Sequence, residues 1–170
     1  QMCIRDRFYM DKQYHPVEIE EKWSKVWSER VISNKDSDTS FSQVIPPPNV
    51  TGTLHMGHSF QYAIMDFYTR YHHMSGKDAH WQVGADHAGI ATQMVVENNL
   101  AKKDVTRLEL GREKFLDEVW SWKDYSEEKI TSQIKRLGCS VDWNKYRFTL
   151  DEGCNDCLLY TSPSPRDRVL

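Results

Sequence analysis

The chain has 170 residues and a formal net charge of −3, which argues against a protein that clamps nucleic acid over its whole surface. No apolar run is long enough to span a membrane and no signal peptide is visible, so we expect a cytoplasmic protein with no membrane partner. Its four cysteines, Cys3, Cys139, Cys154 and Cys157, form no disulfide framework, which favours a reducing compartment.

The two ends of the chain differ in composition from the middle. Residues 1–7 read QMCIRDR and residues 158–170 read LLYTSPSPRDRVL, so both ends carry the tripeptide Arg-Asp-Arg. We interpret residues 1–9 as a non-native leader and residues 157–170 as a non-native tail, with one domain portion over residues 10–156. On composition alone, a natural disordered tail explains the Ser- and Pro-rich end equally well.

Hydrophobic periodicity predicts helices and strands in alternating order. Apolar residues at helical spacing predict helices after Pro16 and over residues 58–74, 90–103 and 111–137, the last ended by Gly138. Short apolar runs predict strands over residues 41–45 and 79–83, a polar loop at 34–40, and extended pieces at 141–143 and 147–150. This order implies an α/β fold with a parallel sheet, flanking helices and right-handed crossovers.

Two sets of aromatic residues are predicted to lie in the core. One is the stripe at helical spacing on the helix over 58–74, made of Phe60, Ile64, Phe67, Tyr68 and Tyr71. The other is the pair Trp120 and Trp122. We expect both sets to pack in the interior and not to stack on bases. The charged stretch at 102–114 is expected to be solvated surface.

The most informative pattern is VIPPPNVTGTLHMGH over residues 44–58, where the first strand runs into a helix. Three prolines fix φ and remove three N–H donors, so the turn is stiff. Gly52 and Gly57 allow close approach of the backbone, and the helix start offers free N–H groups and a positive dipole end to an anion. His55 and His58 are three residues apart, which places both imidazoles on one side of a helical turn. The layout predicts a phosphate-binding junction.

A second loop, GADHAG over residues 84–89, follows the second strand. In parallel α/β sheets, ligands sit beyond the carboxyl ends of the strands, and both loops leave strands at that edge. We therefore expect the two loops to face one pocket. Other roles stay open at this point, because His55 and His58 could cap their helix or lie in the core, and Asp86 could cap the helix that begins near Ile90.

Two metal or redox interpretations also have to be weighed. His55 and His58 with Asp86 and His87 would make a plausible zinc ligand set, although the chain has no HExxH motif. Cys154 and Cys157 form a CxxC pair, but no second pair accompanies them, so we interpret their spacing as chance.

Taken together, the motifs resemble those of the class I aminoacyl-tRNA synthetases. Residues 55–58, HMGH, stand where that family has its HIGH signature, with methionine as a volume-conserving replacement of isoleucine. The segments PPPNVTG (46–52), WQVGADHAGIATQ (81–93), RLG (136–138), DW (142–143) and RFTLDEG (147–153) are similar to the valine-specific branch of the family. The resemblance covers residues 10–156 and implies the first half of a Rossmann-like catalytic domain.

The resemblance implies a ligase that activates valine with ATP and transfers it to the tRNA for valine. It gives the catalytic role to His55 and His58. The ATP contacts that it implies are Thr51, Gly52, Thr53, His55, Gly57, His58, His87 and Gly89. The amino-acid contacts that it implies are Pro47, Asn49 and Asp86, with Asp86 paired to the substrate ammonium. Mg²⁺ would come with the ATP phosphates, no protein-bound metal is expected, and the parent protein is expected to be monomeric.

Several parts of the family pattern are not in these residues: the Lys-Met-Ser-Lys-Ser loop, the editing insertion and the anticodon-binding helices. We therefore expect the 170 residues alone to catalyse little or no valine-dependent ATP–pyrophosphate exchange. The alternative function is a non-catalytic nucleotide-binding α/β module derived from a synthetase.

Overall fold

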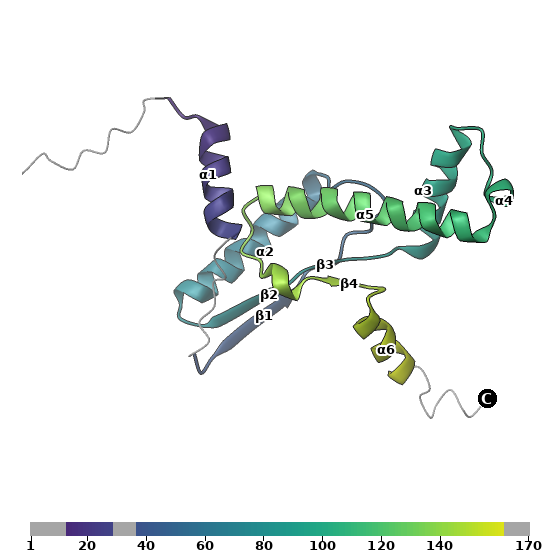
Figure 1. Ribbon diagram of the computed structural model, residues 1–170. Helices are drawn as coiled ribbons and strands as arrows, with labels where there is room; N and C mark the ends of the chain where they lie inside the picture. The colour runs from purple at the N-terminus through teal and green to yellow at the C-terminus, as the bar shows by residue number, and fades with distance from the viewer. Residues whose placement is uncertain (1–12, 29–36, 162–170) are drawn as a thin grey trace, which may run out of the picture.

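The computed structural model describes residues 13–28 and 37–161, whose arrangement is shown in Figure 1. The helices are α1 (Pro16–Ser28), α2 (Met56–Met74), α3 (Gly89–Ala101), α4 (Arg107–Leu110), α5 (Arg112–Arg136) and α6 (Glu152–Thr161), with a short 3-10 helix η2 (Trp143–Lys145). The strands are β1 (Ser40–Val44), β2 (Asp78–Gln82), β3 (Gly84–Ala85) and β4 (Arg147–Phe148).

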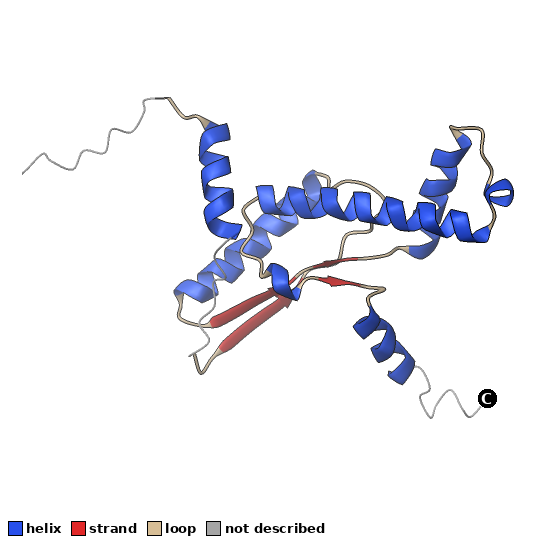
Figure 2. Ribbon diagram, in the orientation of Figure 1, coloured by secondary structure: helices blue, strands red, loops and turns tan. Residues whose placement is uncertain are grey.

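The strands form two parallel pairs, drawn in red in Figure 2. β1 pairs with β2 from Ser40 opposite Asp78 to Val44 opposite Gln82, and α2 is the crossover between them. β3 pairs with β4, and only Val83 separates β2 from β3 along the chain. The predicted α/β fold with parallel strands and flanking helices is confirmed.

The main core lies where α2 and α5 meet the strands. Its buried side chains come from β2 and the ends of the strands (Ile45, Trp81, Val83), from α2 (Tyr62) and from α5 (Ile130, Ile134). In Figure 1 both helices lie above the β1–β2 pair, so one helical layer covers these strands. A second cluster of Val96, Leu100 and Phe115 joins α3 to α5. The long helix α5 therefore connects both parts of the interior.

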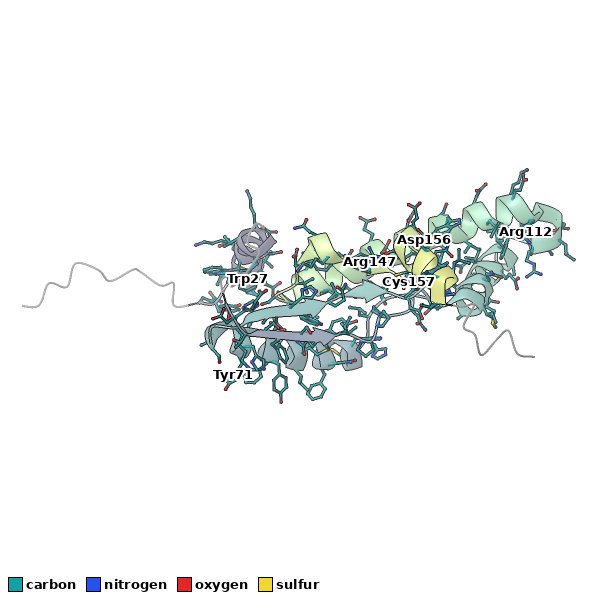
Figure 3. The ribbon with its side chains drawn as sticks, turned by 90° about the horizontal axis from the view of Figure 1, so that it is seen from below. Trp27, Tyr71, Arg112, Arg147, Asp156 and Cys157 are labelled. Atoms are coloured by element: carbon teal, nitrogen blue, oxygen red, sulfur yellow. The ribbon has the colours of Figure 1, made fainter. Side chains whose placement is uncertain are left out.

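The aromatic stripe of α2 is on the surface, which contradicts the prediction that it is core. Phe60 and Phe67 are 71% and 65% exposed, and Tyr71 points away from the strands in Figure 3. The buried side of the helix carries Tyr62 and Thr69 instead. α2 has apolar residues on two faces, and the positions of the strands decide which face is buried.

The prediction that Trp120 and Trp122 both lie in the core holds only in part. Trp120 is 48% exposed and rests edge-on against Phe148 at a ring-centroid distance of 6.4 Å. Trp122 is half-buried and uses its indole N–H for a hydrogen bond to the Val50 carbonyl. Neither ring is simply an apolar core residue.

Other element boundaries differ from the predictions in a few places. Gly84 and Ala85 form β3 where a loop was expected, and residues 107–110 form the helix α4 inside the stretch expected to be only solvated surface. In the extended piece predicted at 141–143, Asp142 is extended but Trp143 begins η2, whereas the extended piece at 147–150 contains β4. The long helix does end before Gly138, which takes a left-handed φ of 71° as predicted.

The proposed ends of the native segment stay predictions. α6 runs from Glu152 to Thr161 and so crosses the boundary drawn between residues 156 and 157. The leader at residues 1–9 and residues 34–36 of the predicted loop at 34–40 lie outside the described residues. Within the parts of the chain that are described, none of the helices combines the length and the apolar character that crossing a membrane requires.

The core at the crossing of α2 and α5 generates a stability prediction. Ile130 is 1% exposed, so Ile130→Ala leaves a cavity and should lower the free energy of unfolding by about 2–5 kcal/mol. Ile90 is 81% exposed on α3, and Ile90→Ala should change it by less than about 0.5 kcal/mol. Urea denaturation of the two variants makes the comparison. Equal losses would mean that Ile130 is not a core residue.

Candidate functional site

The two loops that leave β1 and β3 are joined by backbone hydrogen bonds. The Asp86 N–H donates to the Pro48 carbonyl at 2.8 Å, and the Val50 N–H donates to the Asp86 carbonyl at 3.0 Å. Asn49 and Asp86 thus form an isolated parallel bridge beyond the ends of the strands. Both loops therefore lie at one edge of the strands, while their facing one pocket stays a prediction. The bridge brings Asn49, one of the predicted amino-acid residues, beside Asp86.

The helix α5 holds the first loop from the side. The Trp122 indole donates to the Val50 carbonyl at 3.0 Å, and the Ser126 hydroxyl donates to the Gly52 carbonyl at 2.8 Å. Further along the helix, Gln133 Oε1 accepts from the Leu54 N–H at 2.9 Å. These three side chains satisfy alternate backbone groups of residues 50–54, so α5 determines the path of the loop that carries Thr51, Gly52 and Thr53.

None of these three α5 residues was identified from the sequence as part of the site. Ser126 is almost fully buried, and a serine among the apolar positions of a long helix is the one signal that could have indicated a specific polar contact. Its partner Gly52 lies 74 residues away along the chain, so no local pattern could name it.

His55 and His58 cap the helix that they begin. His55 is the N-cap residue of α2, and its Nδ1 accepts from the Gly57 N–H at 3.1 Å. His58 Nδ1 accepts in turn from the His55 N–H at 3.2 Å, which completes a capping box. The two rings lie on one side, with centroids 3.9 Å apart, as their spacing predicted. The capping role, which the sequence left open, is confirmed.

This capping corrects the expectation that free backbone N–H groups await an anion at the start of α2. The Gly57 N–H, expected to face an anion, is already bonded to His55. A Cβ at position 57 would lie 2.9 Å from His55 Cε1, so glycine is needed here for the imidazole to approach. In place of the Gly57 N–H, the imidazoles themselves are candidates to meet an anion.

The hydrogen bonds fix the tautomer of both imidazoles. An Nδ1 that accepts a hydrogen bond carries no proton, so each neutral ring has its proton on Nε2 and offers that N–H as a donor. The pKa of His58 is lowered from its ordinary value by partial burial and, second, by the neighbouring His55. His58 therefore stays neutral at physiological pH and presents an Nε2–H group.

The second loop forms a compact polar cluster around Asp86. Asp86 Oδ1 accepts from the Thr149 hydroxyl at 2.9 Å and from the Ala88 N–H at 3.3 Å. The N-cap of α3 is Ala88, which makes no side-chain cap, so the alternative that Asp86 caps this helix is wrong. Both bonds go to Oδ1, and no described residue bonds Oδ2, which leaves this carboxylate oxygen for a partner of opposite charge.

His87 belongs to the same cluster. Its Nδ1 lies 2.6 Å from Thr149 Oγ1, and its backbone N–H donates to the same oxygen at 2.9 Å. Gly89 begins α3 directly beside the ring, because a Cβ at that position would stand 3.7 Å from His87 Cδ2. Thr149 was not identified from the sequence, although it directly follows β4 and so obeys the rule that pointed to Asp86.

The zinc and redox interpretations receive no support. Among residues 13–28 and 37–161, no three His, Cys, Asp or Glu side chains group closely enough to hold a metal ion. Cys154 and Cys157 both lie on α6 as free thiols. The chemistry of the site therefore comes from one half-exposed carboxylate and the imidazoles.

The contact from α5 to the first loop can be tested by stability. Ser126→Ala removes the donor to the Gly52 carbonyl and should lower the free energy of unfolding by about 1–3 kcal/mol. Ser132 is exposed on the same helix and bonds only within its own turn, so Ser132→Ala should cost less than about 0.5 kcal/mol. Urea denaturation, with amide hydrogen exchange at Leu54, distinguishes them. Similar effects at both positions would contradict the role of Ser126.

The pKa of His58 gives a second test. His55→Asn keeps a side-chain acceptor at the N-cap but removes the neighbouring imidazole, so the pKa of His58 should rise toward its ordinary value near 6.5. In the wild type the lowered pKa means that the unfolded chain binds more protons between the two values. Stability should therefore fall as the pH drops from about 6.5 through the folded pKa. NMR titration of the His58 ring measures the pKa, and urea denaturation at several pH values measures the stability. An unchanged titration midpoint in His55→Asn would contradict the interaction.

Comparison with known proteins identifies the family. The family described as tRNA synthetases class I (I, L, M and V) matches residues 18–161. The valine–tRNA ligase of Acinetobacter baylyi is 54% identical over 146 residues, which are 85% of this chain and 15% of the relative. The valine–tRNA ligase of Aquifex aeolicus is 53% identical over 145 residues, which are 84% of this chain and 12% of the relative.

A solved structure shares the fold. It is a ternary complex of LeuRS, tRNA and LeuAMS from Agrobacterium radiobacter K84, with a TM-score of 0.68 and 18% sequence identity. The match covers 88% of this chain and 18% of that one. The chain thus spans less than one fifth of the curated relatives and of this structure. Because the family matches most of this chain, the chain belongs to the class I tRNA synthetases.

Proposed function

We propose that the chain is part of a valine–tRNA ligase, which activates valine with ATP and transfers it to the tRNA for valine. The observation that carries the proposal is the hydrogen-bonded bridge between Asn49 and Asp86. It places a carboxylate at one end of the junction whose other end carries the imidazoles of His55 and His58. A carboxylate suits an ammonium group, and imidazole N–H donors suit phosphate oxygens. An α-amino acid and a nucleotide together need that combination.

The names of the relatives support valine as the substrate. The relatives from Acinetobacter baylyi and Legionella pneumophila, each 54% identical to this chain, are both valine–tRNA ligases. A non-catalytic nucleotide-binding module would be favoured by a departure from the arrangement of carboxylate and imidazoles, and the described residues show no such departure. The ligase is therefore the function that we favour.

In the first step of this reaction, the valine carboxylate attacks the α-phosphate of ATP to give valyl-adenylate and pyrophosphate. The protein contributes position and charge stabilisation more than covalent chemistry. The Nε2–H groups of His55 and His58 donate to the phosphate oxygens that gain charge, and Oδ2 of Asp86 holds the ammonium group. Asn49, which is bridged to Asp86, forms part of the amino-acid pocket together with Pro47.

The first loop provides the remaining nucleotide contacts in this proposal. Thr51, Gly52 and Thr53 lie between the bridge and the two histidines, where the hydrogen bonds from α5 hold their backbone in place. His87 and Gly89 lie at the start of α3 and face the nucleoside. Mg²⁺ comes with the phosphates of ATP and is coordinated mainly by them and by water.

Three further assignments follow from the same proposal. The tRNA binds mostly through parts of the ligase beyond these residues, because the chain spans about 15% of the length of its relatives. The ligase acts in the cytoplasm and as a monomer. These three assignments concern the complete ligase and have to be tested on it.

The central role of His58 is tested in the full-length ligase that carries this segment. His58→Ala removes one donor to the phosphates and should lower the rate of valine-dependent ATP–pyrophosphate exchange about 100- to 1,000-fold. His15 is an exposed histidine just before α1, and His15→Ala should leave the rate unchanged. Circular dichroism checks that both variants fold. A wild-type exchange rate in a folded His58→Ala ligase would overturn the role of His58. ATP–pyrophosphate exchange by the wild-type ligase that depends only on another amino acid would overturn valine as the substrate.

A further inference from the structure

Thr149 stands at the centre of the polar cluster on the second loop, and three groups meet its hydroxyl oxygen. Asp86 Oδ1 is 2.9 Å away, the backbone N of His87 is 2.9 Å away, and His87 Nδ1 is 2.6 Å away. Thr149 comes from the end of β4, more than 60 residues from both partners. The side chain that connects Asp86 and His87 therefore belongs to neither loop of the sequence pattern.

The protons of this cluster can be placed by counting donors. A threonine hydroxyl has one hydrogen, and a carboxylate is only an acceptor, so the hydroxyl hydrogen goes to Asp86. The His87 backbone N–H donates to the hydroxyl oxygen. The short contact to His87 Nδ1 is then a hydrogen bond only if Nδ1 carries a proton and donates it as well.

The opposite tautomer leaves a conflict. If His87 Nδ1 were unprotonated, the single hydroxyl hydrogen could satisfy either the imidazole or the carboxylate but not both. The unprotonated nitrogen would also lie 3.3 Å from Asp86 Oδ1, with two lone pairs facing each other. A proton on Nδ1 removes both problems and allows a second, longer hydrogen bond to Asp86.

We propose that Thr149 is a positioning residue that orients Asp86 and holds His87 in the Nδ1–H tautomer. His87 then presents an unprotonated Nε2, which is a hydrogen-bond acceptor, and no described residue donates to it. His55 and His58 present Nε2–H donors on the other loop. The site therefore offers donors toward phosphate and an acceptor toward a hydroxyl or amino group of the nucleoside, the last point resting on the proposed function.

The tautomer is tested without any activity by ¹H–¹⁵N correlation spectra of the imidazole rings in the 170-residue chain at pH 8. His87 should appear as the Nδ1–H form, with His55 and His58 in the same spectrum as Nε2–H references. Thr149→Val keeps the shape but removes the hydroxyl, and the Nδ1–H share of His87 should fall. Thr149→Ser should restore it. Wild-type His87 in the Nε2–H form, or an unchanged tautomer in a folded Thr149→Val chain, would overturn the proposal.

The orienting effect on Asp86 is tested in the full-length ligase by the same two variants. Loss of one hydrogen bond to the carboxylate should raise KM for valine about tenfold in Thr149→Val, with a smaller change in kcat and recovery in Thr149→Ser. An unchanged KM would remove the role of Thr149 in amino-acid binding. If the wild-type ligase activates no valine at all, the proposed function fails, while the ring spectra still decide the tautomer.

Discussion

The bridge between Asn49 and Asp86 is the contact on which the site depends. Two hydrogen bonds, from Asp86 N–H to the Pro48 carbonyl and from Val50 N–H to the Asp86 carbonyl, join loops that leave different strands. Proline at positions 46–48 removes competing donors and limits the backbone, so the first loop has few other conformations to adopt. The bridge is therefore the direct link between the loop of the carboxylate and the loop of the two histidines.

The helix α5 supports the bridge from outside. Its Trp122, Ser126 and Gln133 bond three backbone groups of residues 50–54, while its Ile130 and Ile134 pack in the core. A single rigid helix thus joins the core to the loop that begins α2. Positions within a site hold their geometry best when their supports are themselves locked by packing, and this helix satisfies that condition.

Hydrogen-bond direction distinguishes the two sides of the site. On the first loop, each histidine uses Nδ1 as an acceptor to cap α2, which leaves Nε2–H groups as donors. On the second loop, the contacts of Thr149 favour the reverse arrangement for His87. The three histidines therefore differ in which ring nitrogen carries the proton, because their hydrogen-bond partners differ. The residue type alone cannot distinguish them.

The sequence by itself determined the alternation of β1, α2, β2 and α3, the long helix α5, the parallel arrangement, and the placement of both loops at one edge. These follow from local periodicity and from the geometry of parallel strands. The spacing of His55 and His58 also predicted correctly that their rings share one side. Only the tertiary structure decided that the aromatic stripe of α2 faces outward, that Ser126 and Trp122 hold the first loop, and that Thr149 joins Asp86 to His87. The physical reason is that each of these depends on which surfaces meet when separate segments pack together, some of them more than 60 residues apart, and a local pattern carries no information about that meeting.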